Sequence, residues 1–406
     1  MEASSKKDFT GALGDYLEYA RARHPRLKAL RARARSARAG AIGAERWPDP
    51  QISAGYFVSP VETRVGPQRA RLGIKQTIPW PGGITAEVES AAAQARAFDD
   101  QVKAQALDLE SRISFVYWSL WALQETQKRV QAHQVIVTGL GEIYRGRLAT
   151  QKTDIVALQR LELEGAQLGE RVASLMAEQA ALRAHLRGLL GLPEGVELPT
   201  GDQPPEPGEA SSLNSSHDLG VHPRITARGH LVDAQLARAE AISASGMPRF
   251  VVGFDWILVG ARDQMNLEDD GRDALVVAVG MSIPLWREAV GAEVRSALEL
   301  AEEARAWQQA DRESQRAEIE ATGHRIADAQ RRVEVHRNTL LPQAQAAFDA
   351  ALGAYSAGEA SGDTVLLAQR TLLDLQISEA RGRADYAIAL AQWAALVGES
   401  AGGPRD

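Results

Sequence analysis

The side chains that most often do chemistry in proteins are sparse and scattered in this sequence. It contains no cysteine, which excludes disulfides, thiolate metal sites and cysteine nucleophiles. No two of its eight histidines are four residues apart and no Glu-x-x-His is present, so the metal-ligand spacings of helical bundles are missing. No nucleophile–base motif and no glycine-rich phosphate loop emerges either. We therefore predict that the chain is not an enzyme and has no metal site and no cofactor.

Composition narrows the possible partners. The 406 residues include 46 Lys and Arg against 53 Asp and Glu, and a net charge of −7 makes bulk nucleic-acid binding a poor candidate. With 45% apolar and 24% charged residues, the chain is expected to fold. No charge-free run is long enough for a membrane-spanning helix, which needs about 18 residues or more. The first twenty residues show no apolar core of a secretory signal, which leaves open whether a signal was removed.

The elements that would position any functional side chain are duplicated. The segment beginning at His24 aligns without gaps with the segment beginning at His222, and the order of later matches is the same in both halves. We predict three parts: a first repeat over residues 1–191, a Pro/Gly/Ser-rich linker over residues 192–218 and a second repeat over residues 219–406. The expected fold is mainly α with a small β part.

Each repeat is expected to contain a helix, two strands, a very long helix and a returning helix. The first helix is predicted over roughly Thr10–Arg46, where prolines end it. The long helix after Gly83 has about 62 residues, which is roughly 95 Å. The second long helix, from about Arg287 to Ala357, contains Pro342, where we expect a kink or a break. The returning helices are predicted over Asp154–Leu189 and Asp363–Val397.

The four predicted strands alternate between apolar and mostly polar residues, which gives the sheet two different faces. The apolar set includes Leu72, Ile74, Phe254, Leu275, Val277 and Val279. The polar set includes Arg69, Arg71, Lys75 and Asp255. Strands of about nine to eleven residues can span a membrane, but four strands leave two open edges, which hydrocarbon does not tolerate. We therefore predict an oligomer whose strands combine around a water-filled lumen, with the apolar set facing lipid.

Three segments make the chain resemble the TolC family of outer-membrane efflux proteins over nearly its whole length. They are QTIPWPGG at Gln76–Gly83, LRGLLGLP at Leu186–Pro193, and the segment Leu340–Asp374. The resemblance implies a homotrimer with a twelve-stranded transmembrane β-barrel continued by a periplasmic α-helical tunnel. It also implies a passive duct for small solutes, which meets a periplasmic adaptor and an inner-membrane efflux pump. The Pro-Trp-Pro-Gly motif is similar to the heavy-metal-resistance branch, whose solutes are metal cations.

The same resemblance implies roles for residues near the tips of the long helices. The expected adaptor contacts are Tyr144, Gly146, Leu148, Ala149, Thr150, Tyr355, Gly358 and Glu359. Asp154 and Asp363 are candidates for an acidic ring at the closed aperture, because a ring of carboxylates attracts cations and repels itself. An Asp at a helix start is also a common N-cap, and the two roles are compatible. The chain departs from many relatives in having no N-terminal cysteine for lipid attachment.

One alternative from a different class is a soluble, elongated coiled-coil scaffold. Long helices without a signal sequence are consistent with such a protein, whereas alternating strands oppose it. The arginines between Arg21 and Arg38 are expected to form a solvated helix face, with a membrane-surface or nucleic-acid role as the alternative. Membrane fractionation of the natural gene product would separate a duct from a scaffold.

Overall fold

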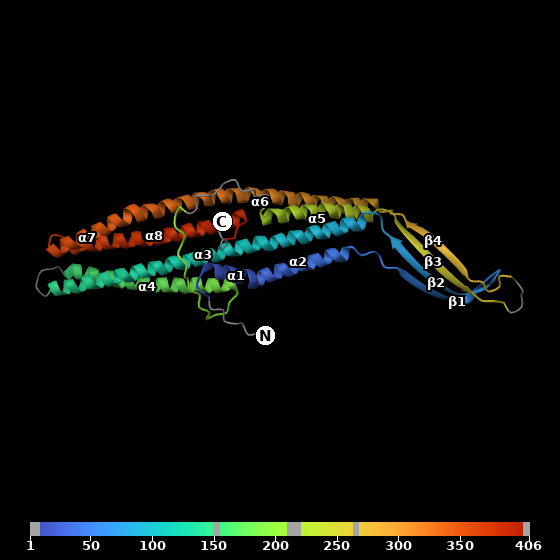
Figure 1. The fold of residues 1–406 in the computed structure, drawn as a ribbon, viewed down its shortest axis with the longest axis horizontal. Coiled ribbons are helices and arrows are strands. Elements are labelled where there is room, and N and C mark those ends of the chain that lie inside the picture. Colours follow the sequence, from blue (N-terminus) through green and yellow to red (C-terminus); the bar gives the residue numbers. More distant parts are fainter. Residues whose placement is uncertain (1–8, 149–154, 209–220, 263–267, 401–406) are drawn as a thin grey trace. The chain divides into compact units, whose positions relative to one another are not determined.

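The computed structural model describes residues 9–148, 155–208, 221–262 and 268–400 and is mainly helical, with one small antiparallel sheet (Figure 1). The elements in chain order are α1 (Leu13–Arg23), α2 (Pro25–Ala44), β1 (Gln51–Thr63), β2 (Gly66–Ile78), α3 (Gly83–Leu148), α4 (Ile155–Leu190), α5 (Pro223–Ser245), β3 (Arg249–Val259), β4 (Ala274–Ser282), α6 (Arg287–Val335), the π-helical turn η2 (His336–Leu340), α7 (Leu341–Ala357) and α8 (Gly362–Val397). The chain divides into two compact units. The helical unit comprises residues 1–29, 102–223 and 311–406, and the sheet unit comprises residues 30–101 and 224–310.

The first predicted helix is in fact two helices. His24 ends α1 with an extended ψ of 127°, and α2 begins at Pro25. The break has a local cause, because a proline disfavours the helical conformation of the residue before it. The backbone N–H of His24 still donates to the Ala20 carbonyl at 2.9 Å, so α1 closes its last turn. The prediction of one helix over Thr10–Arg46 was therefore wrong at this point.

The sheet unit consists of four strands in the order β1-β2-β3-β4, and each pair of neighbours is antiparallel (Figure 1). Helical segments of this unit are joined by polar contacts. The Ser90 hydroxyl of α3 donates to the Ala234 carbonyl of α5 at 2.8 Å. The guanidinium of Arg38 in α2 binds the carboxylate of Asp99 in α3, with Nη2 to Oδ1 at 2.6 Å. These contacts tie the helices that precede and follow the strands to one another.

The helical unit is held by apolar clusters along α3, α4 and α8. One cluster gathers α1, the middle of α3, the end of α4 and the middle of α8, with Tyr16, Tyr117 and Leu186 fully buried. A second cluster joins the ends of α3 and α7 to the starts of α4 and α8, and Phe348 lies within it. Burial of large apolar side chains supplies the stability that long single helices lack.

The described part of the segment between the repeats, residues 192–208, is packed against the helical unit. The Asp202 carboxylate accepts the Leu13 N–H at 2.6 Å and so caps α1 from a distant part of the chain. The Tyr16 hydroxyl donates to the Pro199 carbonyl at 2.6 Å. Glu206 accepts a hydrogen bond from Arg337 Nη1 at 2.5 Å, and this bond lowers the pKa of the Glu206 carboxyl. The segment 192–208 is therefore bound by hydrogen bonds to α1 through Pro199 and Asp202 and to Arg337 through Glu206.

The expected irregularity near Pro342 takes the form of a π-helical turn. Pro342 has no N–H, so an α-helix would leave an upstream carbonyl without its partner. The turn His336–Leu340 lies directly before α7, and the Leu341 N–H bonds to the His336 carbonyl five residues back. Single π turns of this kind are usual places for a helix to change direction.

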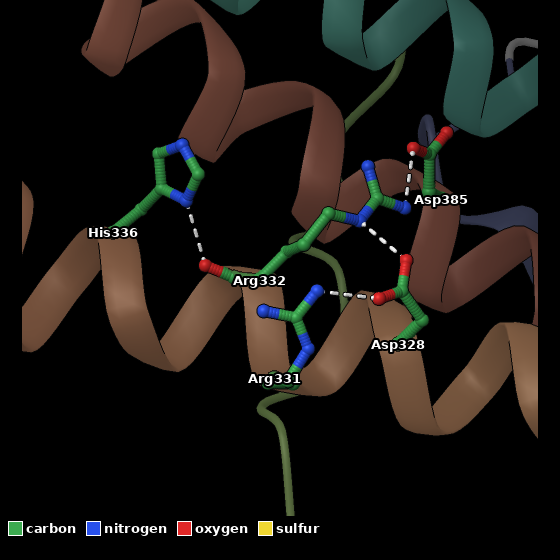
Figure 2. A network of polar contacts seen from close by, with 5 residues as sticks. All are labelled: Asp328, Arg331, Arg332, His336 and Asp385. Atoms are coloured by element: carbon green, nitrogen blue, oxygen red, sulfur yellow. Dashed lines mark hydrogen bonds and ion pairs between the residues drawn. The ribbon is translucent and has the colours of Figure 1, made fainter.

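A polar network joins α6 to α8 beside this turn. Figure 2 shows Arg332 reaching two carboxylates, with Nε 3.0 Å from Asp328 and Nη2 3.3 Å from Asp385. Arg331 binds the other oxygen of Asp328 at 2.6 Å, and these two arginines lower the pKa of the Asp328 carboxyl. The Nδ1 atom of His336 lies 2.7 Å from the Arg332 carbonyl oxygen, one helical turn before it.

Candidate functional site

The register of the sheet separates its residues into two faces. Directly paired residues in antiparallel strands share a face. Leu72 pairs with Trp256, which pairs with Leu275, and Ile74 pairs with Phe254, which pairs with Val277. Val279 follows on the same face, which we call the apolar face. Arg71, Lys75 and Asp255 fall on the opposite face, which we call the charged face.

The apolar face is uncovered by the rest of the described chain. Large side chains on it are exposed, including Val277 at 72% and Val279 at 75% of their full surface. Its other exposed members are Ile52, Tyr56, Leu72, Ile74, Phe250, Val252, Phe254, Trp256, Leu275 and Met281. A contiguous apolar surface of this kind marks an interaction with lipid or with another protein.

The charged face contains a forked ion pair between β2 and β3. Arg71 donates from Nε to Asp255 Oδ1 at 2.9 Å and from Nη2 to Oδ2 at 2.6 Å. Asp255 pairs in register with Gly73, where an added Cβ would lie 2.3 Å from Oδ1. The carboxylate therefore occupies space that only a glycine leaves open.

Two irregularities limit where the faces can be assigned. The register shifts between Tyr56 and Val61 in β1 and between Gln68 and Ala70 in β2. Arg69 is the extra residue at the second shift, and its guanidinium lies against Gly260. A bulge of this kind interrupts the alternation of side chains. The face of Arg69 thus stays a prediction, unlike the faces of Arg71 and Lys75.

Among the described residues, β1 and β4 are the outer strands, and each pairs along one side only. An outer strand presents unpaired backbone N–H and C=O groups to its surroundings. Both outer strands are of sufficient length to accept another strand.

The predicted tip residues lie at the ends of α3 and α7. The rings of Tyr144 and Tyr355 are stacked, with centroids 5.0 Å apart and planes 4° from parallel. Gly358 ends α7 in the left-handed conformation at φ 83°, and the Glu359 N–H returns to the Ala354 carbonyl at 2.8 Å. Gly146 and Leu148 belong to the last turns of α3. Ala149, Thr150 and Asp154 lie outside the described residues.

Asp363 lies in the first turn of α8 and forms an ion pair with Arg160 of α4. The N-cap position is Ser361, so Asp363 does not cap the helix itself. Both side chains of the pair are about half exposed, at 58% and 50%. The location of the carboxylate near a helix N-terminus is also electrostatically favourable.

Sequence reasoning missed the partners of these residues. Glu164 lies four residues after Arg160 on α4, and its carboxylate accepts a hydrogen bond from Arg370 Nε at 2.8 Å. This hydrogen bond raises the pKa of the Arg370 guanidinium. The only available signal was the alignment of Gln159-Arg160 with Gln369-Arg370 between the two halves. That alignment marks equivalent positions but does not say which carboxylate each arginine meets.

Sequence reasoning weighed His133 only as a possible metal ligand and did not predict that it is buried or which residues it contacts. His133 of α3 lies between two glutamines of α8, with Nδ1 2.8 Å from Gln369 Nε2 and Nε2 3.1 Å from Gln376 Oε1. Burial lowers the pKa of the His133 ring. The neutral ring, with its proton on Nε2, satisfies both contacts.

Within the described ranges, no helix is long and apolar enough to cross a membrane. The same residues contain no group of three or more His, Asp or Glu side chains arranged to hold a metal ion.

The chain was compared with protein families, curated sequences and solved structures. Residues 216–399 match the family described as outer membrane efflux protein. Among curated protein sequences, no significant match was found. Solved structures similar to the chain include VceC from Vibrio cholerae, with 20% identity, a TM-score of 0.77 and coverage of 96% of both chains. CusC has 15% identity and a TM-score of 0.78 over 98% of this chain and 95% of that chain. The CmeC outer membrane channel of Campylobacter jejuni has 13% identity and a TM-score of 0.77 over 96% and 86%.

The family match over residues 216–399 and the structural similarities over nearly the whole chain therefore agree with the sheet and helices described above: this chain has the fold of the outer-membrane channels to which it is similar.

Proposed function

We propose that this chain is one subunit of a homotrimeric outer-membrane channel in a tripartite efflux system. Four strands from each of three subunits close a twelve-stranded barrel in the membrane. The helices form a tunnel in the periplasm, and a periplasmic adaptor connects it to an inner-membrane pump. The two halves of each subunit are duplicated repeats joined by residues 192–218. The channel is a passive duct, so the pump supplies the driving force.

One observation carries this proposal: a four-stranded sheet has one exposed apolar face, one charged face and two outer strands that each pair along one edge only. In hydrocarbon every backbone polar group needs a partner, so the outer strands β1 and β4 must meet other strands. Eight strands is the lower limit of known single-chain membrane barrels, so one chain is insufficient. The two faces then have complementary roles, with the apolar face against lipid and the charged face lining water.

The positions of aromatic side chains also support strands that cross a membrane. Trp47, Trp80 and Trp286 lie just outside β1, β2 and β4, in the segments that connect these strands to α2, α3 and α6. Trp80 also stacks on Phe250 at the start of β3, with ring centroids 6.5 Å apart. Trp256 lies toward the other end of β3. Aromatic residues at two levels are typical of the girdles at membrane–water interfaces.

The helical tips are proposed as the adaptor contact and the gate. Tyr144 stacked on Tyr355 gives the ends of α3 and α7 a fixed relation to each other. The Arg160–Asp363 pair joins α4 to α8 near the same ends. Three copies of Asp363 around an axis would attract cations, and pairing with Arg160 would limit their mutual repulsion. Asp154 is proposed as a second acidic position.

Crosslinking between outer strands tests the assembly, because the chain has no native cysteine to interfere. Ala278→Cys on β4 is combined in turn with Gln51→Cys and Ser53→Cys on β1, and membranes are treated with a short bismaleimide. Covalent dimers and trimers, with nothing larger, support the proposal. The control pair Thr77→Cys with Val251→Cys joins β2 to β3, which are register partners within one subunit, and should give monomers only.

The closed trimer would be ruled out if every pair of cysteines on β1 and β4 gave only monomers. It would also be ruled out if crosslinked products of more than three subunits formed. Recovery of the natural gene product in the soluble fraction would instead favour the coiled-coil scaffold. That alternative offers no use for an exposed apolar sheet face. The heavy-metal branch rests on the motif Pro79-Trp80-Pro81-Gly82 and remains a prediction.

A further inference from the structure

The charged face of the sheet has an unbalanced set of charges. In the regular part of the sheet, residues 51–56, 70–78, 249–258 and 274–282, register assigns Arg71, Lys75, Arg249 and Asp255 to this face. The apolar face has no charged residue over the same ranges. Each subunit thus contributes three cations and one carboxylate to the charged face.

The cationic side chains of the charged face are more exposed than its carboxylate, which increases the excess of positive charge that a solute would meet. Arg71, Lys75 and Arg249 are exposed, whereas Asp255 retains only 2% of its surface. The carboxylate is covered because it lies over Gly73 and both its oxygens are engaged by Arg71 at 2.9 and 2.6 Å. A bidentate pair of this geometry holds the carboxylate firmly in place. The Arg71 side chain itself remains 49% exposed. A solute in contact with this face therefore meets cationic groups.

We propose that the charged face makes the barrel lumen selective for anions. This inference rests on the proposed function, because only a closed barrel surrounds the solute with copies of this face. A confined lumen whose walls have one sign of charge raises the local concentration of counter-ions. An uncomplexed metal cation would be repelled by the same wall, whereas an anionic metal complex or an organic anion would be attracted.

Ion selectivity in planar bilayers tests the inference. Zero-current potentials are measured under a potassium chloride gradient for the full chain and for Asp363→Ala, which removes the carboxylate near the helical tip. Chloride should permeate several-fold faster than potassium in Asp363→Ala. Lys75→Glu combined with Arg249→Glu gives the charged face an excess of carboxylates, and the preference should reverse in favour of potassium.

A charge change outside the sheet provides the control. Lys128 is an exposed lysine of α3, and Lys128→Glu should leave the sign of the potential unchanged. If the double variant does not assemble, Lys75→Gln should still weaken the chloride preference. Three results would each overturn the inference. They are a preference for potassium in Asp363→Ala, a zero-current potential of unchanged sign in the double variant, and a shift of that potential in Lys128→Glu as large as in the double variant. A complete lack of conductance in every variant would instead overturn the channel itself, so the two failures are distinguishable.

Discussion

A pair of neighbouring substitutions in β4 gives the sharpest test of which sheet face meets lipid. Val277 and Ala278 are the fourth and fifth of nine residues in the strand, so they differ in depth by at most about 3.4 Å. Val277 lies on the apolar face beside Phe254, and Ala278 lies on the charged face beside Gly253. Arginine at either position adds the same charge and the same final side chain at nearly the same depth, so the main difference is the face.

The expected cost follows from the environment of each site. Arginine on the lipid face near the middle of a bilayer costs about 2–4 kcal/mol, and three copies in a trimer would cost roughly three times as much. A lumen position is in water, so Ala278→Arg should cost far less, apart from repulsion by nearby Lys75. The wild-type chain and both variants are refolded into phosphatidylcholine vesicles, and urea titration followed by tryptophan fluorescence gives the free energy of unfolding.

Val277→Arg should lower that free energy well below the value for Ala278→Arg, and it should also reduce the fraction protected from protease in the vesicles. Equal losses would mean that neither face is in lipid. A larger loss for Ala278→Arg would mean that the faces are assigned the wrong way round, and the proposed lumen would fail with it.

Three further predictions concern the helical unit. Asp363→Ala should break the pair with Arg160 and raise single-channel conductance or weaken block by multivalent cations; unchanged conductance and block would remove the gating role. Tyr117→Phe removes a hydroxyl that donates to the Gly11 carbonyl at 2.6 Å and accepts the Asp202 N–H at 2.9 Å, so it should cost about 1–3 kcal/mol. Faster hydrogen exchange at Asp202 would check this, and protection equal to wild type would contradict it. Burial lowers the pKa of His133, so the stability it contributes is present above its unfolded pKa of about 6.5 and is lost as pH falls through the lower folded value. His133→Gln should therefore lose less stability between pH 7 and pH 5 than wild type does, in urea titrations at each pH.

Local periodicity explains why much of the sheet unit was predictable. Side chains in a strand alternate with a period of two whatever the strand pairs with, so the apolar and charged sets could be read from residues such as Leu72 and Arg71 alone. The same reasoning located the strands to within a few residues, apart from the bulge at Arg69, where one extra residue breaks the period. The helix break at Pro25 has an equally local cause, although a continuous helix was expected there.

Most of the helices and strands, and the two faces of the strands, could be predicted from local patterns because they depend on residues close together in the chain. The absence of cysteine chemistry follows from composition. The tertiary structure alone decided which charges meet. Arg71 and Asp255 are 184 residues apart, and Arg160 and Asp363 are 203 residues apart. Their pairing depends on the register between strands and the alignment between helices. Those are set by packing over the whole interface, and no local pattern encodes them.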